Sequence, residues 1–211
     1  MVQNTTKIGE IMDKKEDRRI DKTKSLIENT LIELLKEKSF NKITIKDLTE
    51  RANIGRGTFY IHYSDKYDML EQIEDNIISE MKDMCEEETR NIPEDTLLPS
   101  NKKAFTSLFI KIYTCISNHS EIIQVLLGPN SDMSFTMKIK NFVKGFILKQ
   151  VKPKLINNKI PFEYLQEIAI SLHLSIITRW LKNGMKELPE ELAAMSSKIA
   201  SSVFNEIFNK L

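Results

Sequence analysis

The sequence predicts an all-α protein. Of its 211 residues, only 6 are glycine and 6 are proline, whereas the helix-favouring residues leucine, isoleucine, lysine and glutamate are abundant. Apolar residues recur at helical spacing through most of the chain, and no useful length alternates between apolar and polar residues as a strand would. We therefore expect about nine helices and no sheet.

The front of the chain predicts a polar arm and then three helices close together. Apolar residues at helical spacing define the first helix. Thr44 caps the second, and Asp47 stands three positions on, where its carboxylate can bond a free amide. Two helices joined by three or four residues are typical of a helix-turn-helix arrangement. The expected segments are a flexible arm at 1–15 and helices at 17–38, 45–52 and 56–63.

The rest of the chain predicts six further helices. Ser64 or Asp65 is a suitable N-cap for a long helix that follows at once. Pro161 and Pro189 stand where prolines open helices, and Gly184 stands where a glycine ends one. The expected helices span 66–90, 101–119, 120–127, 132–153, 161–184 and 189–210.

Composition and cysteine spacing disfavour several classes of protein. Apolar residues make up 41% of the chain and charged residues 29%, a balance typical of globular proteins. The two cysteines lie thirty positions apart without a CxxC motif, so the spacing predicts neither a disulfide framework nor a zinc site. The N-terminus lacks the apolar core of a secretory signal, and the most apolar stretch, 168–181, is too short and polar to span a bilayer. We therefore expect a cytoplasmic protein without a membrane partner.

Charge is distributed unevenly. Residues 14–70 hold 13 basic and 10 acidic side chains, whereas residues 71–90 hold 2 basic and 8 acidic ones. A modestly basic front followed by an acidic segment fits a front end that meets a polyanion. Solvated helix faces would explain the same pattern.

The short helix at 56–63 begins with an arginine between two glycines. A phosphate-binding P-loop is disfavoured, because the spacing is wrong and no apolar strand precedes it. A plain surface turn with Phe59 and Tyr63 packed inward explains the aromatic residues but not the hydrogen-bonding side chains between them. A recognition helix explains both, since small residues let the backbone approach phosphate and a guanidinium matches guanine O6 and N7.

The segment TIKDLTERANIGRGTFYIHYSDKYDML resembles the DNA-binding domain of TetR-family bacterial transcription regulators. Spacing and residue type agree across four elements, over about residues 18–75. The resemblance implies a helix-turn-helix DNA-binding domain at 16–65 and a helical effector-binding and dimerisation domain at 66–211. Gly55 departs from the family pattern, where a serine or threonine cap is commoner. The resemblance assigns DNA contacts, with Lys66 on a phosphate, to Thr44, Lys46, Gly55, Arg56, Gly57, Thr58, Tyr60, His62 and Lys66.

The segment RWLKNGMKELPEELAAM resembles the end of the eighth and the start of the ninth helix of a TetR subgroup. In this family the last two helices form a four-helix bundle with a second subunit, which implies a homodimer. Residues 168–177 are apolar almost all round, as a helix buried on several sides would be. An ordinary intrachain core is the alternative. Dimer contacts are expected at Ile168, Leu172, Ile176, Met195, Ile199 and Val203.

An aromatic stripe runs through the middle of the chain. Such a stripe is most often core, but in this family the equivalent region can enclose an apolar effector pocket, with Tyr113 or His173 as the polar contact. The expected pocket residues are Phe105, Phe109, Tyr113, Phe142, Phe146 and His173.

The remaining cysteines and histidines predict neither metal binding nor catalysis. His119 is expected at a helix end, and a metal site there would need further ligands. Cys115, four positions earlier, is expected to be a buried apolar residue. A cysteine–histidine nucleophile pair is geometrically possible, but the sequence shows no third group that would orient it. We therefore expect no cofactor, no metal and no enzymatic activity.

The leading hypothesis is a homodimeric TetR-type repressor that a small apolar effector releases from a palindromic operator in double-stranded DNA. The alternative is a ligand-binding coactivator or adaptor of the same fold, which activates transcription or no longer binds DNA. Four residues favour the first hypothesis, because a protein that had lost DNA binding would have no need of them: Arg56, Thr58, Tyr60 and Lys66.

Overall fold

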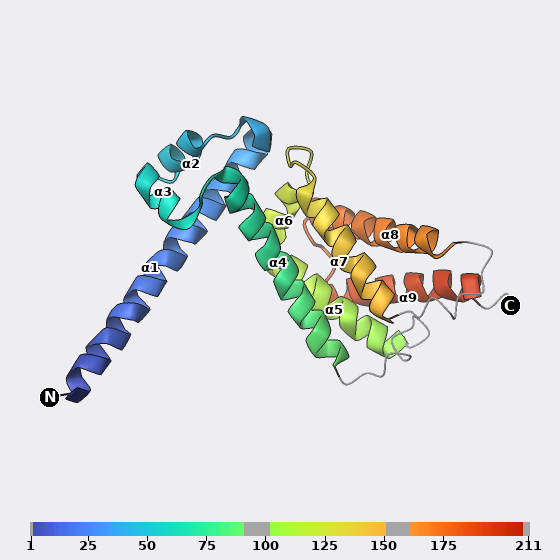
Figure 1. Cartoon of the computed structure of the whole chain (residues 1–211). Coiled ribbons are helices and arrows are strands. Elements are labelled where there is room, and N and C mark those ends of the chain that lie inside the picture. The colour runs from blue at the N-terminus through green and yellow to red at the C-terminus, as the bar shows by residue number, and fades with distance from the viewer. Residues whose placement is uncertain (1, 91–101, 151–160, 209–211) are drawn as a thin grey trace. The chain divides into compact units, whose positions relative to one another are not determined.

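The computed structural model describes residues 2–90, 102–150 and 161–208, and every regular element in them is helical (Figure 1). The all-α prediction is confirmed for this part of the chain, which contains nine α-helices. None of the described helices combines the length and the apolar composition that a membrane crossing requires. The elements are α1 (Val2–Glu37), a 3₁₀ turn η1 (Phe40–Lys42), α2 (Ile45–Arg51), α3 (Arg56–His62), α4 (Lys66–Thr89), α5 (Lys102–Asn118), α6 (Ser120–Leu126), α7 (Ser134–Gln150), α8 (Phe162–Lys182) and α9 (Pro189–Phe208).

The first helix begins earlier than the sequence pattern predicts. We expected it to start at residue 17 after an arm, whereas α1 runs from Val2. Residues 2–16 contain no proline, so the helix can extend toward the N-terminus one hydrogen bond at a time once its later turns are fixed by packing. The flexibility expected of residues 1–15 stays a prediction.

The chain divides into two compact units. The first comprises Met1–Ile73 and Pro129–Asp132, and the second comprises Glu74–Gly128 and Met133–Leu211. The division falls inside α4, so this helix contributes residues to both units. The boundary expected from the sequence lay at the start of α4, about two helical turns earlier.

In the first unit, α1, α2 and α3 pack against one another. The amide of Thr44 donates to Asp47 Oδ2 at 2.8 Å, and the amide of Asp47 donates to Thr44 Oγ1 at 3.1 Å, which confirms the predicted cap of α2. Asp65 caps α4 by accepting hydrogen bonds from the amides of Tyr67 and Asp68 at 2.7 and 2.8 Å. The buried side chains of this unit include Ile27, Leu31, Leu35, Phe40, Ile43, Leu48, Phe59, Tyr63 and Met69.

A loop distant in sequence completes the first unit. The carbonyl of Asn130 accepts a 2.8 Å hydrogen bond from the amide of Phe40, and its side-chain amide donates a 2.8 Å bond to the carbonyl of Leu35. These bonds satisfy backbone groups at the C-terminal end of α1 and the start of η1, where a helix leaves donors and acceptors unpaired.

In the second unit, α5 packs most extensively against α9, while α8 packs against α6 and α7. Gly184 adopts φ +77°, a left-handed conformation that ends α8 where the sequence predicted a glycine stop. Trp180 is buried near this end, and its indole N–H donates to the carbonyl of Glu187 at 3.0 Å. The turn between α8 and α9 is therefore held by both backbone and side chain.

Candidate functional site

The helix α3 has one buried face and one exposed face. Phe59 and Tyr63 are buried with their ring centroids 5.6 Å apart, as the sequence predicted. Residues four apart share a helix face, so this aromatic pair orients the whole helix. Arg56, Gly57 and Tyr60 are exposed, so a partner can reach them.

Ile61 is a residue of this exposed face that the sequence analysis missed. Its side chain is 77% exposed, the most of any large apolar residue that the structure describes. It lies two positions after Phe59 and two before Tyr63, which places it opposite both inward rings on a helix. That spacing was the signal that could have found it. An apolar side chain on such a face can contact the methyl group of thymine.

Neither glycine at the start of α3 is required by the protein's own packing. A Cβ atom at Gly55 would meet only Thr58 Oγ1, at 3.8 Å, and one at Gly57 would have no neighbour within 4 Å. Gly55 has φ −71°, which any residue can adopt, and Gly57 lies in regular helix. The missing side chains therefore leave room on the outside of the protein, toward whatever approaches α3.

The start of α2 forms a tight polar cluster. Lys38 Nζ lies 2.8 Å from Asp47 Oδ2, and the hydroxyl of Thr44 donates to the same oxygen at 2.7 Å. The bonds from Lys38 and Thr44 hold the pKa of the Asp47 carboxyl well below its usual range. Lys46 next to it is exposed and pairs with Glu50 at 3.6 Å, a surface contact worth little. The ammonium of Lys46 is therefore available to a partner, whereas the Thr44 hydroxyl is already engaged.

Lys66 has an internal position that the sequence analysis did not predict. Its ammonium donates to the carbonyls of Phe40, Asn41 and Ile43 at 3.0, 3.1 and 2.8 Å. It also lies 4.9 Å from the centre of the Phe40 ring, and burial lowers its pKa. All three ammonium hydrogens are thus directed at η1 and the chain that follows it. A phosphate contact would have to compete with these bonds, and it stays a prediction.

The remaining candidate residues of the first unit lie at the edge of the exposed face. Thr58 and His62 are partly buried on α3, with His62 beside the Tyr63 ring at 6.3 Å between centroids. Their roles in DNA contact also stay predictions.

The second unit contains a cavity of about 220 Å³, lined by side chains of six helices from α4 to α9. Its walls are almost wholly apolar, and the most aromatic stretch of them comes from α5, where Phe105 and Phe109 lie edge to face at 4.9 Å. All six residues that the sequence analysis placed in a pocket line this cavity: Phe105, Phe109, Tyr113, Phe142, Phe146 and His173.

Two polar atoms in the cavity wall are buried without a hydrogen-bond partner in the described part of the chain, namely His173 Nδ1 and Gln166 Nε2. The ring centroid of His173 lies 4.7 Å from that of Phe109, and burial lowers the pKa of His173 to about 4, so it is neutral at pH 7. Unpaired buried groups are costly, and a ligand that paired with them would gain affinity. Sequence reasoning did not find Gln166, because nothing in its spacing separates it from surface glutamines.

The structure describes the side chains of five of the six residues expected at a dimer interface, and Val203 lies beyond them. Two are about half exposed, Ile168 at 50% and Met195 at 46%. Tyr164, one turn before Ile168, is 65% exposed and extends this apolar surface along α8. The other three are partly buried, namely Ile176, Ile199 and Leu172. Of these, Leu172 also lines the cavity.

These features define a helix-turn-helix protein with a second, all-helical unit, and comparison with known proteins identifies its family. The model for bacterial regulatory proteins of the tetR family matches residues 29–73, and the model for a transcriptional regulator C-terminal region of the same family matches residues 103–202. The chain belongs to the TetR family of DNA-binding transcription regulators.

Individual relatives agree with this assignment. An uncharacterized HTH-type transcriptional regulator, YxbF of Bacillus subtilis (strain 168), is 38% identical over 60 residues, which are 28% of this chain but only 16% of that protein. A TetR transcriptional regulator from Streptococcus agalactiae 2603V is 25% identical with a TM-score of 0.57, over 88% of this chain and 97% of that one. The transcriptional regulator FadR from Bacillus subtilis, solved in complex with stearoyl-CoA, has a TM-score of 0.58 at 15% identity, over 84% of this chain and 97% of that one. The last likeness concerns the fold alone.

Proposed function

We propose that this protein is a homodimeric transcriptional repressor that leaves a palindromic operator when a small apolar molecule occupies its cavity. The observation that carries the proposal is the exposed face of α3. It combines a guanidinium, a phenol and an apolar side chain with two glycines that the protein's own packing does not require.

Each type of side chain on that face suits a part of the DNA major groove. Arg56, in the first turn of α3, can donate two hydrogen bonds to guanine O6 and N7. Ile61 can pack against a thymine methyl group. Tyr60, which is 54% exposed, can donate its hydroxyl to a phosphate. Gly57 lets the backbone come close without a side chain in the way.

A homodimer is favoured by the apolar surface of α8 and α9. Tyr164, Ile168 and Met195 are each about half exposed or more in the single chain, so a second copy that covered them would remove apolar area from water. A two-fold dimer presents two α3 helices to half-sites about 34–36 Å apart, or a multiple of that spacing, which is what a palindromic operator requires.

The cavity favours a small apolar effector with one hydrogen-bonding group. Its volume of about 220 Å³ is below the range of about 300–1,000 Å³ usual for drug-sized ligands. An acceptor on the ligand would satisfy Gln166 Nε2, and a donor or an acceptor would satisfy His173 Nδ1. The solved FadR complex holds stearoyl-CoA, so straight-chain fatty acids and alcohols are the first compounds to test.

The DNA-binding arm of the proposal is tested by gel shift at stated salt on the DNA upstream of the protein's own gene. We expect Arg56→Ala to weaken operator binding by about 1–3 kcal/mol and to relax base preference at one position of each half-site. Arg51→Ala is the matched control, because Arg51 is a nearby arginine already paired with Glu37 at 2.6 Å. Unchanged affinity and sequence preference in Arg56→Ala would contradict the recognition role of α3.

The effector arm is tested by adding fatty acids and alcohols of increasing chain length to the protein–DNA complex. An effector that favours the unbound state should lower operator affinity by about 5- to 150-fold, the usual range of allosteric coupling. A reporter gene under the operator separates the two hypotheses of regulation, because deletion of a repressor raises expression whereas deletion of an activator or adaptor lowers it. Lowered expression would overturn the repressor assignment.

A further inference from the structure

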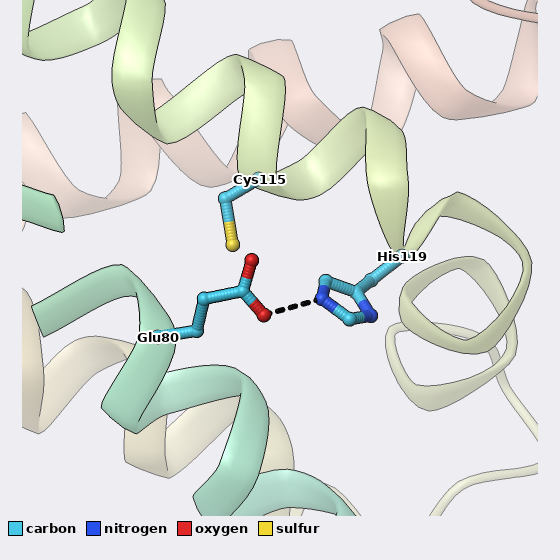
Figure 2. A group of neighbouring side chains, drawn as sticks. All are labelled: Glu80, Cys115 and His119. Carbon is cyan, nitrogen blue, oxygen red and sulfur yellow. Dashed lines mark hydrogen bonds and ion pairs between the residues drawn. The ribbon is translucent and has the colours of Figure 1, made fainter. Parts of the chain in front are cut away.

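Three side chains with different metal-binding atoms meet in the second unit, outside the apolar cavity. Glu80 comes from α4, Cys115 from α5, and His119 from the position that joins α5 to α6 (Figure 2). One ligand atom of each lies within 4.8 Å of the others. Glu80 Oε2 and His119 Nε2 are 2.7 Å apart, and Figure 2 shows the Cys115 sulfur directed at the same carboxylate.

The helical backbone fixes where the three side chains stand. Cys115 and His119 are four positions apart, and the amide of His119 donates to the carbonyl of Cys115 at 3.2 Å, so the helical turn continues through both. Two side chains at this spacing stand on one face of a helix, as paired zinc ligands often do. The third group is contributed by another helix, whose neighbouring residues Ile77 and Met81 are buried. Sequence spacing could show the pair Cys115 and His119, but not the carboxylate that faces it.

We propose that Glu80, Cys115 and His119 bind a divalent transition-metal ion of the zinc type. Sulfur, imidazole nitrogen and carboxylate oxygen are the three ligand types of protein zinc sites, and three protein ligands leave a fourth position for water or another ligand. Oxygen- and nitrogen-ligands of a tetrahedral zinc ion stand about 3.4 Å apart. The present separation of 2.7 Å between Glu80 Oε2 and His119 Nε2 therefore needs to open by less than 1 Å.

The surroundings give a cation a route and an electrostatic reason to enter. The side chains of Glu80 and His119 are 38% and 34% exposed, while Cys115 is fully buried behind them. A shallow polar depression adjoins the site and includes Glu80 itself together with three further carboxylates and one guanidinium, those of Asp83, Glu86, Glu87 and Arg90, so acidic groups outnumber basic ones there. Clustered carboxylates raise the local concentration of cations at the open side of the site.

Metal binding at this place would act on the second unit through residues that do not themselves line the cavity. The ion would link α4 to the end of α5, two elements that are joined here by the Glu80–His119 contact and by the hydrogen bond between Cys115 and Glu80. Because only the folded chain brings the three ligands together, bound metal stabilises the fold in proportion to ligand concentration over Kd. The inference does not depend on DNA binding or on an effector, so it can fail without affecting the proposed function.

The test is a titration of the full-length, chelator-treated protein with Co²⁺, followed by displacement with Zn²⁺. We expect one equivalent per chain, the visible absorption of tetrahedral cobalt and a thiolate-to-cobalt charge-transfer band. Zn²⁺ should bleach both and raise the thermal unfolding midpoint. Absence of the thiolate band, or a band of octahedral cobalt alone, would overturn the proposal, because it would mean that the three side chains do not together bind the ion.

Single substitutions test whether Glu80, Cys115 and His119 are the metal ligands. His119→Gln, Cys115→Ser and Glu80→Gln should each weaken Zn²⁺ binding roughly tenfold or more, and Cys115→Ser should also abolish the charge-transfer band. Cys85→Ser and His62→Gln are matched controls that replace the other cysteine and another histidine, and they should bind like the unaltered chain. His119 is partly exposed, so His119→Gln is expected to keep the circular dichroism of the fold. Undiminished binding by the folded His119→Gln variant, or a charge-transfer band lost in Cys85→Ser, would contradict the proposal.

Discussion

The phenol of Tyr113 on α5 and the hydroxyl of Ser196 on α9 share a buried hydrogen bond of 2.7 Å. Tyr113 is 1% exposed and Ser196 is fully buried, so each hydroxyl supplies the hydrogen-bond partner that water would supply at the surface. Burial raises the pKa of Tyr113 to about 12, which keeps the phenol protonated. Since this pair is closed, a polar ligand group in the cavity meets His173 or Gln166 more readily than Tyr113.

Removing one partner of that pair should destabilise the second unit. In Tyr113→Phe the Ser196 hydroxyl is left buried without a partner, so we expect the free energy of unfolding to fall by about 1–3 kcal/mol in urea denaturation. The double variant Tyr113→Phe/Ser196→Ala leaves no unpaired hydroxyl and should recover most of the loss. A single variant as stable as the unaltered protein would show that the bond is not formed in solution.

We expect the folded protein to become less stable as the pH falls, because His173 is buried. Burial lowers its pKa from 6.5 to about 4, so between these values the unfolded chain binds a proton that the folded chain does not. The free energy of unfolding therefore decreases as the pH falls through this window, by on the order of 3 kcal/mol near pH 4. His173→Phe removes the titrating group, and its stability should fall less over the same range. Equal losses in the two proteins would place the titration elsewhere.

Lys66 has two possible roles, bonding to backbone carbonyls or binding a DNA phosphate, and one variant can distinguish them. If its ammonium serves the carbonyls of Phe40, Asn41 and Ile43, Lys66→Met should lower the free energy of unfolding by about 1–3 kcal/mol and leave the salt dependence of operator binding unchanged. If it holds a phosphate, as the family resemblance implies, the slope of log K against log salt should become shallower by about 1. Unchanged stability with a shallower slope would refute the internal role.

The sequence predicted best the features whose signals are local. The caps at Thr44 and Asp65 depend on residues two or three positions away, and the stop at Gly184 depends on one residue's backbone freedom. All six pocket residues fell on one cavity because helical spacing already placed them on inward faces. In the candidate DNA-binding surface, by contrast, Ile61 was not predicted, because an isoleucine in a short helix has the residue type of a buried side chain.

The features that could not be predicted join segments far apart in the chain. Asn130 bonds to residues ninety or more positions earlier, and Glu80 lies thirty-five positions before Cys115. Lys66 looked like a free cation at a helix start, because the carbonyls that it contacts are more than twenty positions away. Spacing within one helix carries no information on which side chain of another helix faces it.

At Gly57, one substitution is expected to change the stability of the fold and the affinity for DNA in opposite directions. It is the second residue of α3, where alanine favours helix by up to about 1 kcal/mol and would have no neighbour within 4 Å. Gly57→Ala should therefore raise the thermal unfolding midpoint while it weakens operator binding, because its methyl group projects into the space that DNA would occupy. Gly55→Ser is the matched contrast.

A serine at position 55 fits without a close contact and can cap α3 with its hydroxyl, so we expect Gly55→Ser to raise the free energy of unfolding by a few tenths of a kcal/mol. The same hydroxyl can reach a phosphate, so operator affinity should rise rather than fall. Gel shifts should thus show that the two variants change operator affinity in opposite directions. Calorimetry should show that both variants raise the stability of the fold. Operator binding by Gly57→Ala as tight as that of the unaltered protein would mean that this face of α3 does not approach the DNA backbone.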